Sequence, residues 1–213
     1  MHHPQTALLL ATLIGTPAWG CKPAPAAQCT GAQLARAKLA GMNLEGIQFD
    51  GANLEWADLG GANLRGADFK GANLKHARLK GADLSGARLD EANAGYANLT
   101  EAVLPKASLR RADLGNADLS QADLERAVLE EADLSRTDLV SADLEDANLR
   151  RAILRGTYLD YANMKNADLT GAEVDKVKMR GTWLKGAMWS DGKLCAAGSV
   201  GECKSPPKRA KEP

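Results

Sequence analysis

The sequence predicts an all-β solenoid, in which one chain winds into about eight stacked coils around a narrow core. Three observations predict it. An apolar residue, Leu in 25 of 32 units, recurs every five residues from Leu34 to Trp189 without an insertion or deletion. Alanine precedes it by two positions in 26 units, and Asp or Asn stands between them in 18 units. Charged residues of alternating sign recur every 20 residues.

A five-residue period fits neither a straight helix nor a flat strand. On a helix, five residues advance about 140°, so the leucines would be spread around the cylinder. On a strand, an odd step sends every second leucine to the opposite face. The chain must therefore bend once per unit, so that each Ala–Leu pair faces the same interior. The expected core residues of one stretch are Leu54, Leu59, Leu64, Phe69 and Leu74.

The charged residues indicate how many units close one coil. If each unit turns the chain by about 90°, four units make a coil of 20 residues, and residues 20 apart lie in one column. Opposite charges that neighbour each other across a ladder stabilise it. We interpret the column as a device that fixes coil register, with a ligand-binding charge ladder as the alternative. The column reads Asp50, Lys70, Asp90, Arg110, Glu130, Arg150, and Glu91, Arg111, Glu131 and Arg151 repeat the pattern beside it.

The run from Ala32 to Trp189, with its pattern A-[DN]-L-x-x, resembles the pentapeptide repeat family. The resemblance implies a right-handed quadrilateral β-helix, which supplies the handedness and the four-sided cross-section. We therefore assign the β-helix to residues 32–189.

The N-terminus is expected to direct export. Residues 1–20 contain a short apolar run and a small-x-small pattern before Cys21, as in a signal segment; a buried N-terminal segment is the alternative. Residues 21–31 are expected to form a cysteine-containing cap. An even number of cysteines in an exported chain suggests two disulfides among Cys21, Cys29, Cys195 and Cys203, with connectivity left open. Lipidation of Cys21, which would give an anchored envelope lipoprotein, is an alternative.

The C-terminus needs a cap because the last coil of a solenoid exposes core and backbone edges. Residues 190–203, which carry Cys195 and Cys203, look like the cap of exported family members. We expect Trp183 to pack under this loop, and an end-to-end homodimer through the cap is the alternative. Residues 204–213 read as a basic, proline-containing, disordered tail.

Two surface features are candidate binding sites. The column of Trp56, His76 and Tyr96 could bind a sugar or a peptide, and the alternative is that the exposed rings only cover turns. The second feature is an acidic stretch between Arg111 and Arg150, which could attract a basic partner or divalent cations, or form solvated turns. Its residues are Asp113, Asp118, Asp123, Asp133, Asp138 and Asp143.

Two departures from the repeat predict a kink or bulge near residues 93–106. Ala94 replaces a core leucine, and Pro105 follows Leu104.

A filled rod offers no cleft for catalysis, so we expect no enzyme and no catalytic residues. We also expect no cofactor and no metal site, because His76 is the only histidine after the signal segment. The expected function is that of an exported, non-catalytic structural or protein-interaction solenoid. Its partner is expected to be a protein and not nucleic acid, since net charge is zero. The family resemblance also implies an alternative, an acidic rod that mimics DNA and binds gyrase.

Overall fold

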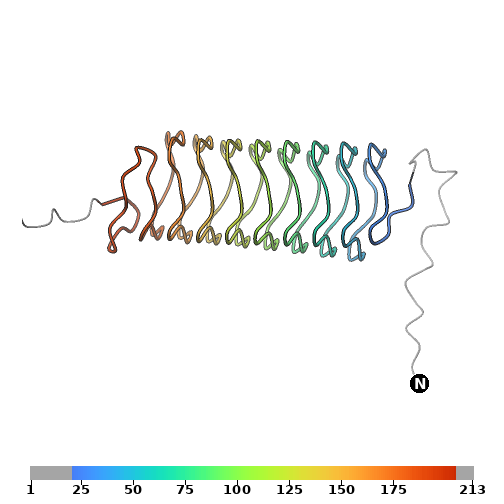
Figure 1. Ribbon diagram of the computed structural model, residues 1–213, viewed down its shortest axis with the longest axis horizontal. Coiled ribbons are helices and arrows are strands. Elements are labelled where there is room, and N and C mark those ends of the chain that lie inside the picture. Colours follow the sequence, from blue (N-terminus) through green and yellow to red (C-terminus); the bar gives the residue numbers. More distant parts are fainter. Residues whose placement is uncertain (1–20, 205–213) are drawn as a thin grey trace, which may run out of the picture.

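The computed structural model describes residues 21–204, which wind into a straight rod of stacked coils with the chain ends at opposite ends of the rod (Figure 1). The predicted signal segment, residues 1–20, and the tail beyond Lys204 lie outside the described residues. The rod is a right-handed quadrilateral β-helix, as predicted.

Each coil contains 20 residues, because every bridge between successive coils joins residues 20 apart. These parallel bridges recur at every fifth residue, from Gln28↔Gln48 to Asp168↔Met188. Each bridge is a single residue long, and residues 21–204 contain no helix and no longer strand. The ladder begins inside the segment expected to be an N-terminal cap, at Gln28. The 20-residue coil expected from the charge columns is therefore confirmed.

Each corner of the coil is a tight turn. At a typical corner, the Ala57 N–H donates to the Leu54 carbonyl at 2.9 Å, and the second corner residue, Trp56, has a φ of 61°. A positive φ at this place defines a type II turn. Every fifth residue from Ala26 to Gly186 has a positive φ, although 20 of these residues are not glycine. Core packing and ladder hydrogen bonds on either side of these residues hold their backbone in a conformation that L-residues rarely adopt.

Asp and Asn recur before more than half of the corners because their side chains complete the turn. The first corner residue has no ladder partner for its N–H, and the Asx side chain two residues earlier accepts it. Gly115 N–H donates to Asp113 Oδ1 at 2.9 Å, and Glu55 N–H to Asn53 Oδ1 at 3.2 Å. The A-[DN]-L pattern thus encodes a core residue, a turn acceptor and a second core residue in order.

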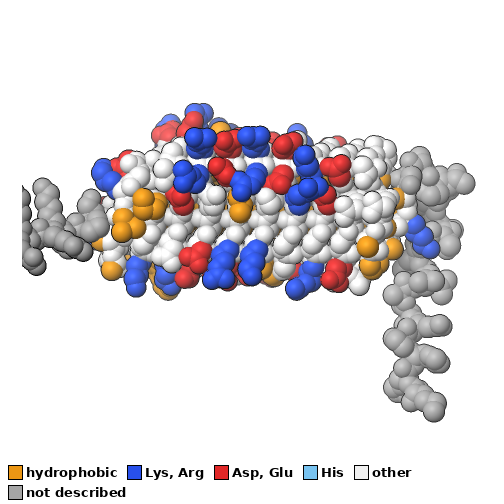
Figure 2. All heavy atoms as spheres, in the orientation of Figure 1, with side chains coloured by type: hydrophobic (Ala, Val, Ile, Leu, Met, Phe, Trp, Pro, Cys, Tyr) orange, Lys and Arg blue, Asp and Glu red, His pale blue; other side chains and the backbone are white. Residues whose placement is uncertain are grey.

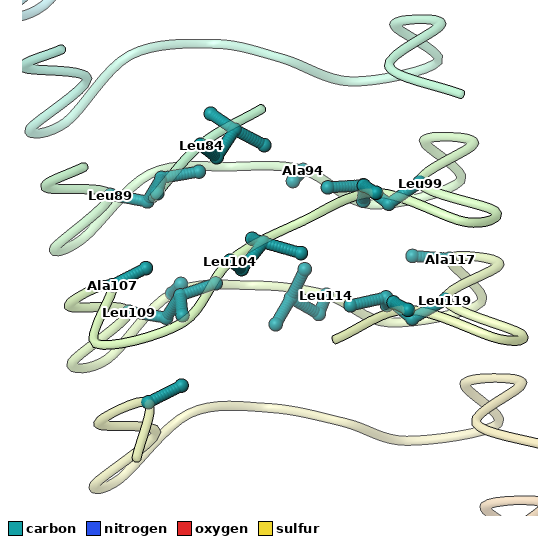
Figure 3. Packing of buried hydrophobic residues seen from close by; sticks show 14 of the residues in the cluster. Leu84, Leu89, Ala94, Leu99, Leu104, Ala107, Leu109, Leu114, Ala117 and Leu119 are labelled. Atoms are coloured by element: carbon teal, nitrogen blue, oxygen red, sulfur yellow. The ribbon is translucent and has the colours of Figure 1, made fainter. Parts of the chain in front are cut away.

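Leucine and alanine side chains fill the interior (Figure 3). The five core residues predicted from one stretch are all fully buried, and Phe69 stacks on Phe49 with ring centroids 5.3 Å apart. Threonine replaces alanine at Thr137, Thr157 and Thr182, where each Oγ1 donates to a leucine carbonyl of the preceding coil at 2.7 Å. Polar groups inside the rod are therefore satisfied by the backbone.

The predicted kink near residues 93–106 is wrong. The bridges Asn93↔Asp113 and Val103↔Asp123 continue the ladder without interruption, and Ala94 is buried above Leu114 (Figure 3). Pro105 fits because it occupies a first corner position, where the amide would have no ladder partner. Its carbonyl still accepts Gly86 N–H at 3.0 Å. A proline that removes an unneeded donor does not disturb the coil.

Disulfides close loops at both ends of the rod, Cys21–Cys29 and Cys195–Cys203. Residues 190–203 fold back over the last coil and pair with it in antiparallel bridges, Trp183↔Val200 and Met188↔Leu194. The expectation that Trp183 packs under this loop is wrong, because its side chain is 53% exposed. The loop instead pairs with its backbone, since position 183 is an outward position.

Candidate functional site

Trp56, His76 and Tyr96 form a continuous stack along one edge of the rod, which we call the aromatic strip. Ring centroids are 4.1 Å apart between Trp56 and His76 and 5.1 Å apart between His76 and Tyr96, with interplanar angles of 13° and 25°. All three occupy the second corner position, with φ near 60°. The coil repeat places them one above another, and the shared backbone conformation sends each ring outward.

The strip presents ring edges to solvent. Trp56 is 51% exposed and Tyr96 is 53% exposed, while the faces that the rings turn toward each other are covered inside the stack. Sugars pack on open ring faces, so this geometry favours a peptide over a sugar among the ligands expected from the sequence. Lys75 Nζ lies 5.8 Å from the Tyr96 ring centroid and adds a cation–π contact.

An uncharged amide ladder runs along the face beside the strip. Asn73 Nδ2 donates to Asn53 Oδ1 at 3.3 Å, and Asn53 Nδ2 donates to Gln33 Oε1 at 3.3 Å. These amides keep one lone pair or N–H free for a ligand. Ring edges and amides lie close together here, with the charged Glu55 and Lys75 at the corner between them.

The alternating charge columns pair within themselves in part: Arg110, Arg111 and Arg151 reach acids of their own columns, whereas Arg150 reaches Asp168 on the neighbouring face. Arg111 Nε lies 2.8 Å from Glu131, which Arg151 also approaches at 3.5 Å, and Arg110 pairs with Glu130. Hydrogen bonds from Arg111 are the main cause of a lowered Glu131 pKa. Rows of opposite charges are visible along the rod in Figure 2. A shallow depression here is lined by equal numbers of acids and bases, Lys70, Arg88, Arg110, Arg111, Asp90, Glu91, Glu130 and Glu131.

The acidic residues do not gather on one side of the rod. They pair by column, one pair on each of three successive faces, so they form a band around the rod instead of a patch. Each also accepts the backbone N–H two residues later, as Asp118 does from Ser120 at 2.9 Å. Partial burial raises the pKa of Asp118, but hydrogen bonds from Ser120 outweigh it and leave the pKa lowered. The three columns are Asp113 and Asp133, Asp118 and Asp138, and Asp123 and Asp143.

Comparison with known families decides the classification. The family model described as pentapeptide repeats matches in eight copies, whose segments run from residue 27 to residue 186. The chain belongs to the pentapeptide repeat family.

Solved structures of other pentapeptide repeat proteins are similar to the chain. HetL, involved in heterocyst differentiation regulation in the cyanobacterium Nostoc sp. strain PCC 7120, is 33% identical over 78% of this chain and 86% of its own, with a TM-score of 0.50. QnrB1, a plasmid-mediated fluoroquinolone resistance protein, is 20% identical over 70% of this chain and 68% of its own, with a TM-score of 0.48. Rfr23 from the cyanobacterium Cyanothece 51142 is 39% identical over 41% of this chain and 63% of its own, with a TM-score of 0.24. Curated proteins gave no match.

The cysteines of this pentapeptide repeat protein form disulfide cross-links at the two ends of the rod. Cys29 and Cys195 are buried at the two ends of the core, and each is bonded to a cysteine eight residues away. The disulfide occupies the Cys21 Sγ atom that a lipid thioether would require. Among residues 21–204, no group of three or more His, Cys, Asp or Glu side chains could hold a metal ion. Within the same range, no helix has the length and apolar character that crossing a bilayer requires.

The sequence analysis missed a second cluster of exposed rings in the last coils. Each ring has a cation above it: Lys178 Nζ is 4.4 Å from the Tyr158 ring centroid, Arg180 Cζ is 5.3 Å from Tyr161, and Lys165 Nζ is 5.1 Å from Trp183. We call these six residues the C-terminal surface. Residues 158 and 178 share a column, so that pair could have been found from the 20-residue spacing.

Proposed function

We propose that this pentapeptide repeat protein is an exported, non-catalytic interaction solenoid that binds a partner protein through the aromatic strip. The observation that carries the proposal is the stack of Trp56, His76 and Tyr96, whose outer edges remain exposed. Packing against each other keeps the rings rigid, so a partner that binds them loses little further side-chain entropy.

The chemistry of the strip favours a protein partner. Tryptophan and tyrosine combine apolar area with a hydrogen-bond donor, and they are enriched among the residues that dominate protein interfaces. The neighbouring amides of Asn53 and Asn73 can accept and donate, which suits the backbone of a peptide. A polyanion such as nucleic acid would instead require a concentration of positive charge.

The filled interior supports a binding role without catalysis. Leucine, alanine and phenylalanine occupy the core along the rod, and in the charged depression on the surface Arg110 pairs with Glu130 and Arg111 with Glu131. The two disulfides support export, because such bonds persist in oxidising compartments and are rare in the cytosol.

Site-specific photocrosslinking tests the binding role. A photoreactive phenylalanine at Tyr96, introduced in the cells that produce the protein, is expected to yield a discrete crosslinked protein. The matched control is the same probe at Asn116, which lies one coil further in the same column and has the same positive φ. Trp56→Ala in the Tyr96-probe chain should abolish the crosslink. Equal crosslinking from positions 96 and 116, or a crosslink that survives Trp56→Ala, would contradict the proposal.

Cell fractionation and intact mass under non-reducing conditions test the export. The expected product lacks a segment of about the first 20 residues, as signal peptides do, and carries four oxidised cysteines. A full-length cytosolic chain with four free thiols would refute this part of the proposal.

A further inference from the structure

The C-terminal surface brings three cation–aromatic pairs onto two adjoining faces of the rod, the corner between them and the next corner, where Lys165 lies. Tyr158 and Lys178 lie on one face, Tyr161 and Arg180 at the corner, and Trp183 on the next face. All three rings belong to exposed side chains. A Cβ at Gly181 would lie 2.6 Å from the Tyr161 ring, which shows that this ring rests directly on the backbone of the next coil.

Aliphatic side chains extend this surface over the cap. Val200 pairs directly with Trp183 across the antiparallel bridge, so the two side chains lie on the same side, and both are exposed. Leu194 pairs with Met188 in the same way on the adjacent face, and it is exposed too. Five of the eight exposed large hydrophobic residues in the described chain therefore lie between residue 158 and residue 200.

The charges of this surface are arranged differently from those of the rod's middle. Lys165 and Lys185 follow each other in one column with no acid between them, whereas the middle columns alternate in sign. Lys178 and Arg180 contact aromatic rings, and within residues 21–204 no carboxylate lies within salt-bridge distance of either side chain. Lys165 approaches Glu145 at 3.8 Å, and Asp160 accepts the Arg180 backbone N–H at 2.6 Å. The side-chain charges of Lys178 and Arg180 are therefore the ones that lack the direct pairing seen between Arg111 and Glu131.

We propose that the C-terminal surface docks the protein on an anionic lipid surface. Lysine and arginine near an anionic membrane are each attracted to its headgroups, and tryptophan and tyrosine favour the interfacial region. Exposed aliphatic residues such as Val200 and Leu194 add apolar area that can enter the headgroup boundary. The rings hold their cations in place, which reduces the entropy that headgroup binding would remove.

The same observations argue against two other occupants. A symmetric contact with a second copy would place Lys178 and Arg180 against their own equivalents, and like charges disfavour such an interface. Nucleic acid would use the cations and could stack on the rings, but it has no use for Val200 and Leu194. An anionic bilayer uses all three kinds of side chain.

Vesicle flotation tests the proposal with the disulfide-intact protein at low salt. Vesicles of equal parts phosphatidylcholine and phosphatidylglycerol should bind the protein, and vesicles of phosphatidylcholine alone should not. Lys178→Glu with Arg180→Glu should lower the bound fraction by about tenfold or more, because each reversal replaces attraction by repulsion. The matched control is Arg110→Glu with Arg111→Glu, which makes the same change in charge at mid-rod and should leave binding within about twofold, because Glu130 and Glu131 already pair with these two arginines.

A second variant, Trp183→Ala, separates interfacial insertion from charge. It should weaken vesicle binding while it retains all three cations of the C-terminal surface, and intrinsic fluorescence of the unmodified chain should shift to the blue on binding. Ellman's assay and thermal unfolding confirm that each variant is folded and oxidised. The proposal is overturned by equal binding to neutral vesicles, by equal loss in the control variant, by tighter binding to duplex DNA at the same phosphate concentration, or by dimerisation that the Lys178 and Arg180 reversals abolish.

Discussion

Gly181→Ala would test how the Tyr161 ring is held against the coil that follows it. The new Cβ would lie 2.6 Å from Tyr161 Cδ1 and 2.8 Å from Cε1, too close for either atom to stay in place. Position 181 also has a φ of 71°, which glycine adopts readily and alanine does not. The substitution therefore perturbs the backbone and the ring contact together.

The two effects can be estimated separately. The left-handed conformation costs a residue with a Cβ roughly 1–2 kcal/mol. The exposed Tyr161 ring can swing away, but it then loses its contact with Arg180, worth about 0.5–1 kcal/mol. We expect local destabilisation of about 2–3 kcal/mol in total. Gly51→Ala is the matched control, since its φ is 61° and its Cβ would meet nothing within 4 Å; it should cost only the backbone part.

Amide hydrogen exchange of the coil that carries each substitution measures the local opening free energy. The Tyr161 N–H, bonded to the Arg180 carbonyl at 2.8 Å, is a suitable probe. In a Tyr161→Ala background, Gly181→Ala should cost no more than Gly51→Ala. If Gly181→Ala and Gly51→Ala cost the same in the unmodified background, the reasoning about the ring is refuted.

Three further changes have defined outcomes. Thr157→Val removes a buried hydroxyl that donates to a backbone carbonyl at 2.7 Å, and urea unfolding should show a loss of about 1 kcal/mol; no change would contradict the hydrogen bond. Asp68 is partly buried, which raises its pKa, but hydrogen bonds from Arg88 and the Lys70 backbone, together with the charges of both residues, outweigh this and leave the pKa below the ordinary 3.8. The stabilisation that the Asp68 carboxylate gives the fold is therefore present above pH 3.8 and is lost as pH falls through the lowered pKa. The difference in the free energy of unfolding between Asp68→Asn and the unmodified chain should disappear over that acidic range and stay constant at higher pH. Replacing Cys195 and Cys203 by serine should speed amide exchange in the last coil alone, because each coil contacts only its neighbours; faster exchange at mid-rod would argue for long-range cooperativity.

The fold could be predicted from the sequence because the core is one column pattern repeated without a break. The apolar residue at every fifth position, as at Leu54 and Leu59, requires the chain to bend once every five residues. The charge columns indicate the 20-residue coil. The kink at Pro105 was wrong for a local reason. Pro105 lacks an N–H, but the first corner amide bonds only to an Asx side chain, and position 103 is valine, so no hydrogen bond is lost.

The candidate sites were harder to predict, since side chains lean across corners. Trp56, His76 and Tyr96 share one column, so the stack followed from spacing alone. Lys165 and Trp183 are 18 residues apart and sit at a corner and on a face, so no column links them. Their contact depends on how far a lysine side chain reaches sideways, which no repeat pattern encodes.

The invariant step of 20 residues between bonded partners also governs how such a chain can change in length. Inserting or deleting 20 residues would alter the distance between the aromatic strip and the C-terminal surface by one inter-coil spacing, about 4.8 Å, and leave both facing as they do now. Inserting five residues would instead rotate everything downstream by a quarter turn, carrying Tyr161 from the edge next to Trp56 to the one beyond. Changes in length by whole coils would thus alter the distance between the aromatic strip and the C-terminal surface. Changes by single pentapeptides would rotate one of these surfaces about the rod axis relative to the other.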